Sequence, residues 1–306
     1  MSELIDKPKI SIGIPVYNGE KLIEKTLNSI LKQTYQDFEI VISDNASTDS
    51  TQDICKNYVK IDNRIKYHRQ SENMGPYWNF NYVLEQALGE YFTWFAIDDI
   101  HAESFLEKNL RVLEENSNVV ASISNVKYFG PNLENIEKDD LFQKFKNIFK
   151  YRFDKPTKFK QVFPAYGLYG KKATLYLRMD RSTGLYAVFR KPIIRKSMIV
   201  HPFASSDLAI ILNVLKHGDF HVIDEILMEK YIGGYSSKGI IQTLKFQNTS
   251  YLEIIFMSMP FTSWCAKNLG WKIFLKNFDW FVLFNIHGFY LIFSDFIHIL
   301  QKDSQI

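Results

Sequence analysis

Hydrophobic positions in the first half of the chain follow two periods in turn. Short apolar or alternating runs typical of buried strands cover Ile10–Ile14, Phe38–Ser43, Ile65–Arg69, Tyr91–Ile97 and Val119–Tyr128. Between these runs apolar residues recur at helical spacing, for example over Leu22–Leu31 and from Pro76 to Ala87. Strands that alternate with helices predict right-handed βαβ units. We therefore expect an α/β fold with a doubly wound, mostly parallel sheet flanked by helices.

Polar side chains follow the first four strands, at the point where each strand ends. They are Tyr17 and Asn18, Asp44 and Asn45, Asn73, and Asp98 and Asp99. The carboxyl ends of parallel strands share one edge, where open α/β sheets bind ligands, so we expect these side chains to converge. Each loop taken alone also suits an ordinary turn, and Asp49 with Gln52 resembles a capping box.

Asp98 and Asp99 form the most unusual of these loops, because two adjacent carboxylates end an apolar, aromatic run. Side by side they repel each other unless a cation lies between them. Mg²⁺ or Mn²⁺, carrying a phosphorylated ligand, would supply that charge through oxygen ligands. A solvated loop that caps the next helix, Glu103–Asn116, is the alternative interpretation.

Asp207 is a second candidate for chemistry. The strand pattern resumes at Leu185–Phe189, and Ala204-Ser205-Ser206-Asp207 then opens a helix with an apolar face. A carboxylate in the first turn is favoured by capping and by the helix dipole, which is its structural interpretation. The same carboxylate, if it faces a crevice, suits a general base.

Beyond Tyr231 the chain becomes aromatic and aliphatic. Three segments stand out: Ser250–Met259, Ser263–Phe274 and Phe278–Leu300. The last has the length of a membrane span, but polar residues interrupt it. On a helical wheel His287, Asp295, His298 and Lys302 share a narrow face, which favours a helix in a membrane interface with this face towards water. Packing against the rest of the chain or against a second subunit is the alternative.

Composition narrows the class of protein. Of the 306 residues 46% are hydrophobic and 15% aromatic, which indicates a globular chain. The net charge of +3 gives no argument for binding to nucleic acid. The lysines of the loosely patterned insertion 131–161 suit a solvated helical face or contact with phosphate or an anionic membrane. Cys55 and Cys265 lie in apolar segments, and the N-terminus lacks a secretory signal, so we expect reduced thiols and a cytoplasmic protein.

The first 120 or so residues resemble a known family. Four motifs occur in the family's order, namely Ile14–Asn18, Ser43–Asp49, Asn73-x-Gly75 through Asn81, and Gly89-Glu90-Tyr91 with the acidic pair. In these motifs the chain is similar to family 2 glycosyltransferases of the GT-A fold. The resemblance is looser from Leu185 to Tyr231. It implies a GT-A type sheet, here followed by an aromatic-rich helical C-terminal extension.

The resemblance implies roles for particular residues. Pro15, Tyr17 and Asp44 would hold the base and ribose of a nucleotide-sugar, with Asn18, Asn45, Asn73 and Asp98 also in the donor site. Asp98 would hold a divalent metal, Mg²⁺ or Mn²⁺, that neutralises the diphosphate leaving group. Asp207 would deprotonate the acceptor hydroxyl, which attacks the anomeric carbon with inversion.

Several positions depart from the family pattern. Ala96 replaces the first Asp of the family's Asp-x-Asp motif, which leaves Asp99 as a substitute metal contact and makes metal dependence less firmly implied than catalysis. Phe80 stands where many members have Arg, and Tyr231-Ile232-Gly233-Gly234 lacks a late His or Arg. His201 and His221 are metal contacts only in principle, because a lone His is more often structural.

The resemblance and the patterns together give an expected organisation. We expect a glycosyltransferase domain over residues 1–235, with a nucleotide-binding part at about 1–128 and an acceptor part at about 129–235, and a helical extension over 236–306. The expected partners are a nucleotide-sugar, with a UDP-sugar first, a saccharide or lipid-linked saccharide acceptor, a membrane surface at the C-terminal helices, and a second copy of the chain. The expected location is the cytoplasm, including the inner face of the cell membrane, and the expected role is surface polysaccharide or lipopolysaccharide synthesis.

Rival functions are less well supported by the motifs. No Gly-x-Gly-x-x-Gly follows the first strand, as a Rossmann dehydrogenase requires, and Gly167–Lys171 has the wrong spacing for a P-loop. A nucleotidyltransferase that makes sugar nucleotides usually has a Gly-rich, basic first loop, which Tyr17–Glu20 is not. A degenerate, membrane-docked binding module is the non-enzyme alternative, and retention of Asp44, Asp98 and Asp207 speaks against it.

Overall fold

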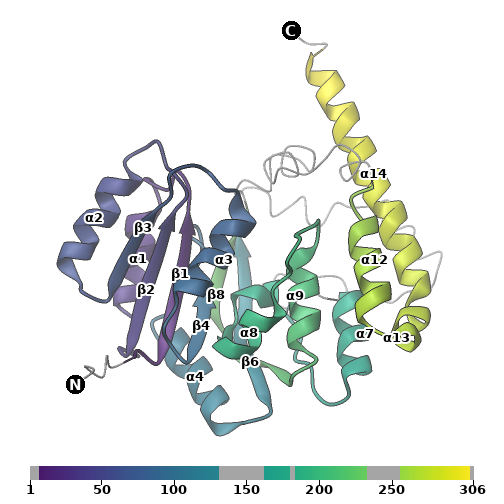
Figure 1. The fold of residues 1–306 in the computed structure, drawn as a ribbon, viewed down its shortest axis with the longest axis horizontal. Helices are drawn as coiled ribbons and strands as arrows, with labels where there is room; N and C mark the ends of the chain where they lie inside the picture. The colour runs from purple at the N-terminus through teal and green to yellow at the C-terminus, as the bar shows by residue number, and fades with distance from the viewer. Residues whose placement is uncertain (1–6, 131–161, 180–182, 233–255, 304–306) are drawn as a thin grey trace.

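A computed structural model describes residues 7–130, 162–179, 183–232 and 256–303 (Figure 1). The predicted insertion at 131–161, the domain boundary at 235/236, Gly233 and Gly234, and the first part of the predicted segment at 250–259 lie outside these residues. Of the last turns of the final helix, 298–303, only the backbone is described, so the predicted roles of the His298 and Lys302 side chains are not addressed.

The first half of the chain alternates strands and helices as expected. Its elements are β1 (Ile10–Val16), α1 (Ile23–Leu31), β2 (Phe38–Asp44), α2 (Thr51–Ile61), β3 (Ile65–Arg69), α3 (Pro76–Gln86), β4 (Tyr91–Trp94), β5 (Ile100–His101), α4 (Phe105–Glu115) and β6 (Val119–Phe129). Strands β3, β2, β1 and β4 pair in parallel in that order. Their carboxyl ends therefore share one edge of the sheet.

The second half completes the sheet and adds helices. Its elements are α7 (Tyr169–Met179), the 3₁₀ turn η1 (Thr183–Tyr186), β7 (Val188–Arg190), α8 (Lys191–Ser197), α9 (Ser206–Val214), β8 (Asp219–Tyr231), α12 (Met259–Asn268), α13 (Trp271–Lys276) and α14 (Phe278–Asp303). The sheet has eight strands in the order β3-β2-β1-β4-β7-β6-β8-β5, with β7 antiparallel to β4 and β6, and β5 antiparallel to β8. The predicted α/β fold with a mostly parallel sheet is confirmed.

Some predicted boundaries are wrong. The strand expected over Tyr91–Ile97 ends at Trp94, because the chain then turns towards the acidic pair, and the strand expected at Leu185–Phe189 is the shorter β7 preceded by η1. The capping box at Asp49 does not form. Instead one Asp49 oxygen accepts bonds from the Thr51 amide and hydroxyl, and the other accepts a bond from the Glu20 amide. Gly89 is needed for close packing, since a Cβ there would lie 2.7 Å from the Ser11 amide nitrogen.

The three C-terminal helices pack on the same core as the sheet. Figure 1 shows α12, α13 and α14 together at the end of the molecule opposite α2. Phe261, Cys265, Trp280 and Phe281 are buried and belong to the main hydrophobic cluster. Both cysteines are buried and free, as expected. Packing against the rest of the chain, one of the predicted alternatives, therefore accounts for one face of α14.

His101 is a buried ring whose two nitrogens have no hydrogen-bond partner among the described residues. It stacks on Phe95 with 3.6 Å between ring centroids and meets Phe105 edge to face. Burial, with a smaller effect of Lys230, lowers the pKa of His101 to about 3. The ring is therefore neutral in the folded protein at every pH where the fold is usually studied.

We expect His101→Phe to reduce acid sensitivity. The unfolded chain protonates this ring below a pKa of about 6.5, whereas the folded chain does not until about pH 3, so stability is lost as pH falls through that window. At about pH 4.5 the loss amounts to about 2.7 kcal/mol. Denaturant unfolding of both proteins between these pH values measures it. The exposed His201→Phe should keep the wild-type slope, and an unchanged slope in His101→Phe would refute the assignment.

Candidate functional site

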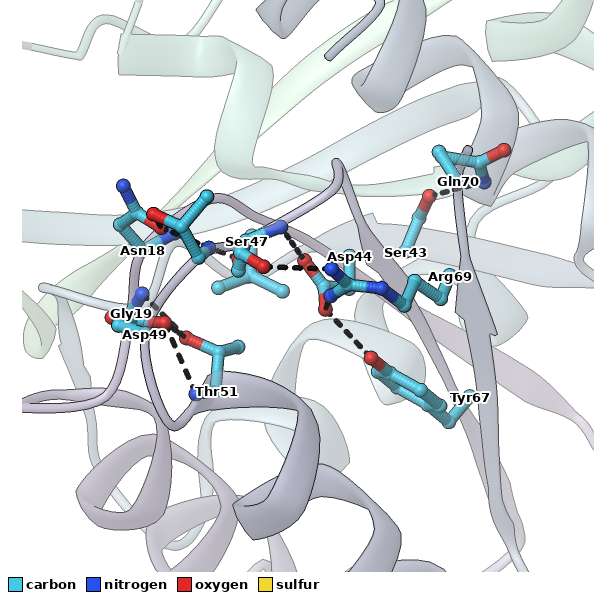
Figure 2. Close-up of polar contacts among 12 residues, drawn as sticks. Asn18, Gly19, Ser43, Asp44, Ser47, Asp49, Thr51, Tyr67, Arg69 and Gln70 are labelled. Carbon is cyan, nitrogen blue, oxygen red and sulfur yellow. Dashed lines mark hydrogen bonds and ion pairs between the residues drawn. The ribbon is translucent and has the colours of Figure 1, made fainter. Parts of the chain in front are cut away.

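The loops after β1 and β2 are fastened to each other by hydrogen bonds (Figure 2). The Asn18 amide donates to Ser47 Oγ, and Asn18 Oδ1 accepts a bond from the Thr48 amide, both at 2.8 Å. The Gly19 amide donates to Thr51 Oγ1, also at 2.8 Å. Asn18 adopts a left-handed backbone conformation with φ 51°, which asparagine tolerates better than most residues. Asn18 is thus a structural link between two strand ends.

Asp44 is the buried centre of this edge, with no exposed surface. Its Oδ1 accepts a bond from the Ser47 amide, and its Oδ2 accepts bonds from the Tyr67 hydroxyl at 2.6 Å and from Arg69 Nη1 at 2.7 Å (Figure 2). Strand register explains the arrangement, because Asp44 pairs with Arg69 across β2 and β3. A carboxylate accepts about four hydrogen bonds, so one acceptor position remains.

The loop before α3 is tied to the same edge through Asn45. Asn45 Nδ2 donates to Asn73 Oδ1 at 2.7 Å and to the Gly75 carbonyl at 3.2 Å, and its Oδ1 accepts a bond from the Met74 amide. Gly75 has φ 86°, a conformation that glycine adopts without strain. The side chains of Asn45 and Asn73 are thus engaged within the protein. Their predicted contribution to a nucleotide-sugar site stays a prediction.

Asn79, on α3, links the ends of β1 and β2 through its side-chain amide. Its Nδ2 donates to the Ser43 carbonyl at 2.9 Å and to the Val16 carbonyl at 3.4 Å. The residue is buried, and its Oδ1 has no hydrogen-bond partner. The sequence alone does not mark Asn79 as part of the site, because a single polar residue is ordinary in an amphipathic helix.

The acidic pair lies in the turn between β4 and β5, next to the loop after β1. The Thr26 hydroxyl donates to the Ile97 carbonyl at 2.7 Å, and a Cβ on Gly19 would meet the Ile97 side chain at 2.8 Å. Asp98 is partly exposed, whereas Asp99 is buried. Each of the four strand-end loops therefore contacts at least one of the others, and the acidic turn does so through the loop after β1.

Asp99 has a partner that the sequence did not suggest. Lys230 Nζ lies 3.6 Å from Asp99 Oδ2, and the Tyr231 amide donates to Asp99 Oδ1 at 3.0 Å. The ammonium also lies 3.7 Å from the centre of the Tyr186 ring, a cation–π contact. The exposed fraction of the side chain is 1% for Asp99 and 23% for Lys230. This buried pair links the acidic turn to the end of β8.

The electrostatics of the pair follow from its burial. Burial raises the pKa of Asp99 to about 6, Lys230 opposes the rise, and Asp98 adds to it. For Lys230 burial alone would lower the pKa, but Tyr186 and Asp99 outweigh it, so the net shift of the pKa is upwards. Lys230 is therefore a fixed cation beside the Asp99 carboxylate.

Asp207 lies in the first turn of α9, after Ser205, which has a left-handed backbone with φ 71°. Asp207 Oδ1 accepts a bond from the adjacent Leu208 amide at 2.9 Å. The turn η1, which carries Tyr186, packs against both α9 and β4. The helix that carries Asp207 and the strand that leads into the acidic turn thus both contact η1.

The residues present fit a divalent metal only in part. Asp98 offers a partly exposed carboxylate, but Asp99, the other predicted metal contact, already faces Lys230 and a backbone amide. Within the described ranges, no three His, Cys, Asp or Glu side chains gather closely enough to hold a metal ion. A hollow of about 550 Å³ beside α1 is lined by other residues, among them Lys21, Lys25 and Glu103.

Comparison with known proteins supports the family resemblance that the four motifs imply. The family model for "Glycosyl transferase family 2" matches residues 11–179. A Campylobacter jejuni protein, GalNAc(5)-diNAcBac-PP-undecaprenol beta-1,3-glucosyltransferase, is 30% identical over 197 residues, which cover 58% of this chain and 62% of that protein. The chain thus spans less than two thirds of that relative's length.

Solved structures share the fold. Staphylococcus aureus TarS residues 1–349 in complex with UDP-GlcNAc gives a TM-score of 0.58 at 19% identity, over 83% of this chain and 64% of that chain. A Pyrobaculum calidifontis mannosyltransferase in complex with GDP-Man and Mn²⁺ gives 0.56 at 15% identity, over 96% and 76%. These likenesses confirm the predicted GT-A type fold. With a family match over more than half of its length, this chain belongs to glycosyl transferase family 2.

Proposed function

We propose that this protein transfers one sugar from a nucleotide-sugar, a UDP-sugar first of all, to a hydroxyl of a saccharide or lipid-linked saccharide, with inversion. The observation that carries the proposal is the sheet edge of a chain of this family. There hydrogen bonds join the loops after β1, β2 and β3, and the turn that carries Asp98 lies against the loop after β1. The family match also favours sugar transfer over the synthesis of sugar nucleotides.

The donor site in this proposal lies over the ends of β1 and β2. Pro15 and Tyr17 would contact the base and ribose, and Tyr17 is 38% exposed, so its ring is accessible. Asp44 has no exposed surface and is held by Arg69 and Tyr67, so its predicted hydrogen bond from the base would require the Arg69 side chain to move aside. Asn18, Asn45 and Asn73 would act by fixing the loops.

Asp98 is the proposed protein contact of a divalent metal. A bound Mg²⁺ or Mn²⁺ would supply Lewis-acid stabilisation of the diphosphate leaving group. We assign Asp99 to a different task, because its carboxylate is paired with Lys230: it holds this cation close to the acidic turn. Lys230 thereby keeps positive charge on the side of the site where the diphosphate would depart.

Asp207 is the proposed general base. A partly exposed carboxylate at a helix start is oriented by the bond that its Oδ1 accepts from the Leu208 amide. In that position it would take the proton of the acceptor hydroxyl as the oxygen attacks the anomeric carbon.

The proposed acceptor is lipid-linked, which would place the enzyme at the inner face of the cell membrane. The Campylobacter relative, whose name contains a PP-undecaprenol acceptor, supports this choice. That name describes the Campylobacter protein alone. For this chain the acceptor, the linkage and a role in surface polysaccharide synthesis are our proposal.

We expect nucleoside diphosphates to stabilise the protein against heat, and Mn²⁺ to strengthen the effect. A ligand at a hundred times its dissociation constant stabilises a fold by about 2.7 kcal/mol. Melting temperatures with UDP, GDP and ADP, each with and without Mn²⁺, measure this. Asp98→Asn should keep the metal-free shift and lose the gain from Mn²⁺, whereas the exposed Asp53→Asn should behave as wild type.

Two results would contradict the proposal. If none of the three diphosphates raises the melting temperature, the donor site is absent. If they do but the protein neither hydrolyses nor transfers any offered nucleotide-sugar, the non-catalytic binding module is the better description.

A further inference from the structure

Helix α14 exposes a continuous row of large apolar side chains. The row, called the apolar stripe below, consists of Phe278, Val282, Ile286, Phe289, Phe293 and Phe296. Their spacing of three or four residues places them on one side of the helix. Phe293 is the most exposed at 64%. Every residue of α14 that is exposed, as far as Ile297, is apolar or aromatic.

The opposite side of α14 is used for packing on the protein. Trp280, Phe281 and Phe284 stack with Phe261 or with one another. Asn285 Nδ2 donates to Thr262 Oγ1, and Asp279 pairs with Arg178 at 2.9 Å. Of the predicted polar face, His287 and Asp295 are half-buried and the other two side chains lie outside the described part, so its orientation towards water stays a prediction. The apolar stripe faces outward.

Exposed lysines flank this surface. The short helix α13, which directly precedes α14, exposes Trp271 at 68% and Leu275 at 59%, together with Lys272 and Lys276. Of the two acidic residues on α14 up to Ile297, Asp279 is 38% exposed but paired with Arg178, and Asp295 is half-buried; α13 has none. Aromatic and aliphatic side chains beside lysines form the composition that binds an anionic lipid surface, because the rings enter the interface while the ammonium groups meet the headgroups.

The geometry decides between lying on a membrane and crossing it. The segment Phe278–Ile297 is long and apolar enough to cross a bilayer by length and composition. One face of the helix, however, is committed to α12 and α7 through the contacts above. A helix that crosses the hydrocarbon region would have to take these neighbours with it or give up their packing. An orientation in the plane of the membrane keeps all of these contacts.

We propose that the apolar stripe, with Trp271 and Leu275, inserts into the surface of an anionic phospholipid membrane while α14 lies parallel to it. Lys272 and Lys276 contact the headgroups. Aromatic rings make up most of the stripe, whereas seams between paired helices favour aliphatic residues, so lipid is a better occupant than a second copy of the chain. The inference is independent of the proposed sugar transfer, since it uses no residue of the donor site.

Vesicle sedimentation of the full-length protein tests this surface. We expect binding to vesicles of phosphatidylcholine mixed with phosphatidylglycerol, weaker binding to phosphatidylcholine alone, and release by high salt or carbonate. The variant Phe289→Glu/Phe293→Glu should lower the bound fraction at least about tenfold. The control Ile61→Glu/Val200→Glu, at two sites exposed by 72% and 85% on the sheet-bearing body, should bind as wild type.

Four outcomes would overturn the inference. They are no binding of the wild type, equal binding of the stripe variant, release by detergent alone, which indicates a helix that spans the bilayer, and a wild-type dimer that the stripe variant converts to a monomer. Matching circular dichroism and melting temperatures of both variants and the wild type separate loss of binding from loss of fold.

Discussion

Asp207→Asn is expected to lower the turnover number for sugar transfer by about 10³-fold. Asparagine has nearly the same shape as aspartate and keeps an oxygen that can accept the bond from the Leu208 amide. It cannot take a proton from the acceptor hydroxyl at neutral pH. The loss should therefore fall on turnover, with the dissociation constant of the nucleoside diphosphate changed by less than about threefold.

A matched control comes from another helix start. Asp53 also lies in the first turn of its helix, α2, and is exposed, so Asp53→Asn removes the same charge from a helix start away from the proposed base. It should retain wild-type turnover. If Asp207→Asn turns over as fast as Asp53→Asn, the role of Asp207 is helix stabilisation and the base lies elsewhere.

Lys230→Met is expected to cost about 3–5 kcal/mol of unfolding free energy at neutral pH. The substitution leaves the Asp99 carboxylate buried with only the Tyr231 amide as a charge-stabilising partner. Because burial already raises the pKa of Asp99 to about 6, loss of the cation should raise this pKa further. Below that pKa the carboxyl is neutral, so the variant should regain part of its stability as the pH falls. Urea unfolding at several pH values measures both effects.

Two further variants distinguish the energetic contribution of the buried Asp99–Lys230 pair from that of an exposed ion pair. Lys127→Met removes the pair with Glu229, whose partners are 45% and 36% exposed, and should cost less than about 1 kcal/mol. The double variant Lys230→Met/Asp99→Asn should recover most of the lost stability, because no buried charge is left alone. Equal losses in Lys230→Met and Lys127→Met would show that the Asp99–Lys230 pair carries no special energy.

The sequence predicted the sheet well, because the hydrophobic periodicity of each strand and helix is a local pattern. Period-two and period-3.6 runs between Ile10 and Phe129 recur in order, and strand-end polarity is visible at Asp44 and Asp98. Parallel pairing then brings the loops together, since the strands share their direction. Boundaries failed where tertiary contacts decide them, as at Trp94, after which the chain leaves the strand for the acidic turn.

The candidate site was predicted less completely. Asp99 and Lys230 are far apart in the chain, and their contact depends on the antiparallel pairing of β5 with β8, which has only two residue pairs. Neither residue type has a periodic signal that reveals such a partner. Arg69 is a similar case: its position at the end of a strand is readable, but its ion pair with Asp44 follows from the register of β2 and β3.

The orientation of α14 could not be read from its helical wheel. The wheel identifies a polar and an apolar face, but which residues pack on the protein depends on partners on other elements, such as Thr262 for Asn285 and Arg178 for Asp279. A wheel assumes that polar groups seek water. Between Phe278 and Ile297 the large apolar residues Trp280, Phe281 and Leu283 are buried, whereas most of the others are exposed or half-buried.

The bonds between the loops after β1 and β2 bear on attempts to re-engineer donor choice. Backbone amides of the first loop, at Asn18, Gly19 and Glu20, end on side chains of the second, at Ser47, Thr51 and Asp49. Transplanting one loop alone from a relative would leave hydrogen-bond donors or acceptors of the other loop without partners. The effects of substitutions in the two loops would therefore not be additive. Grafts that alter sugar-nucleotide preference in this scaffold should therefore exchange both loops as a single cassette.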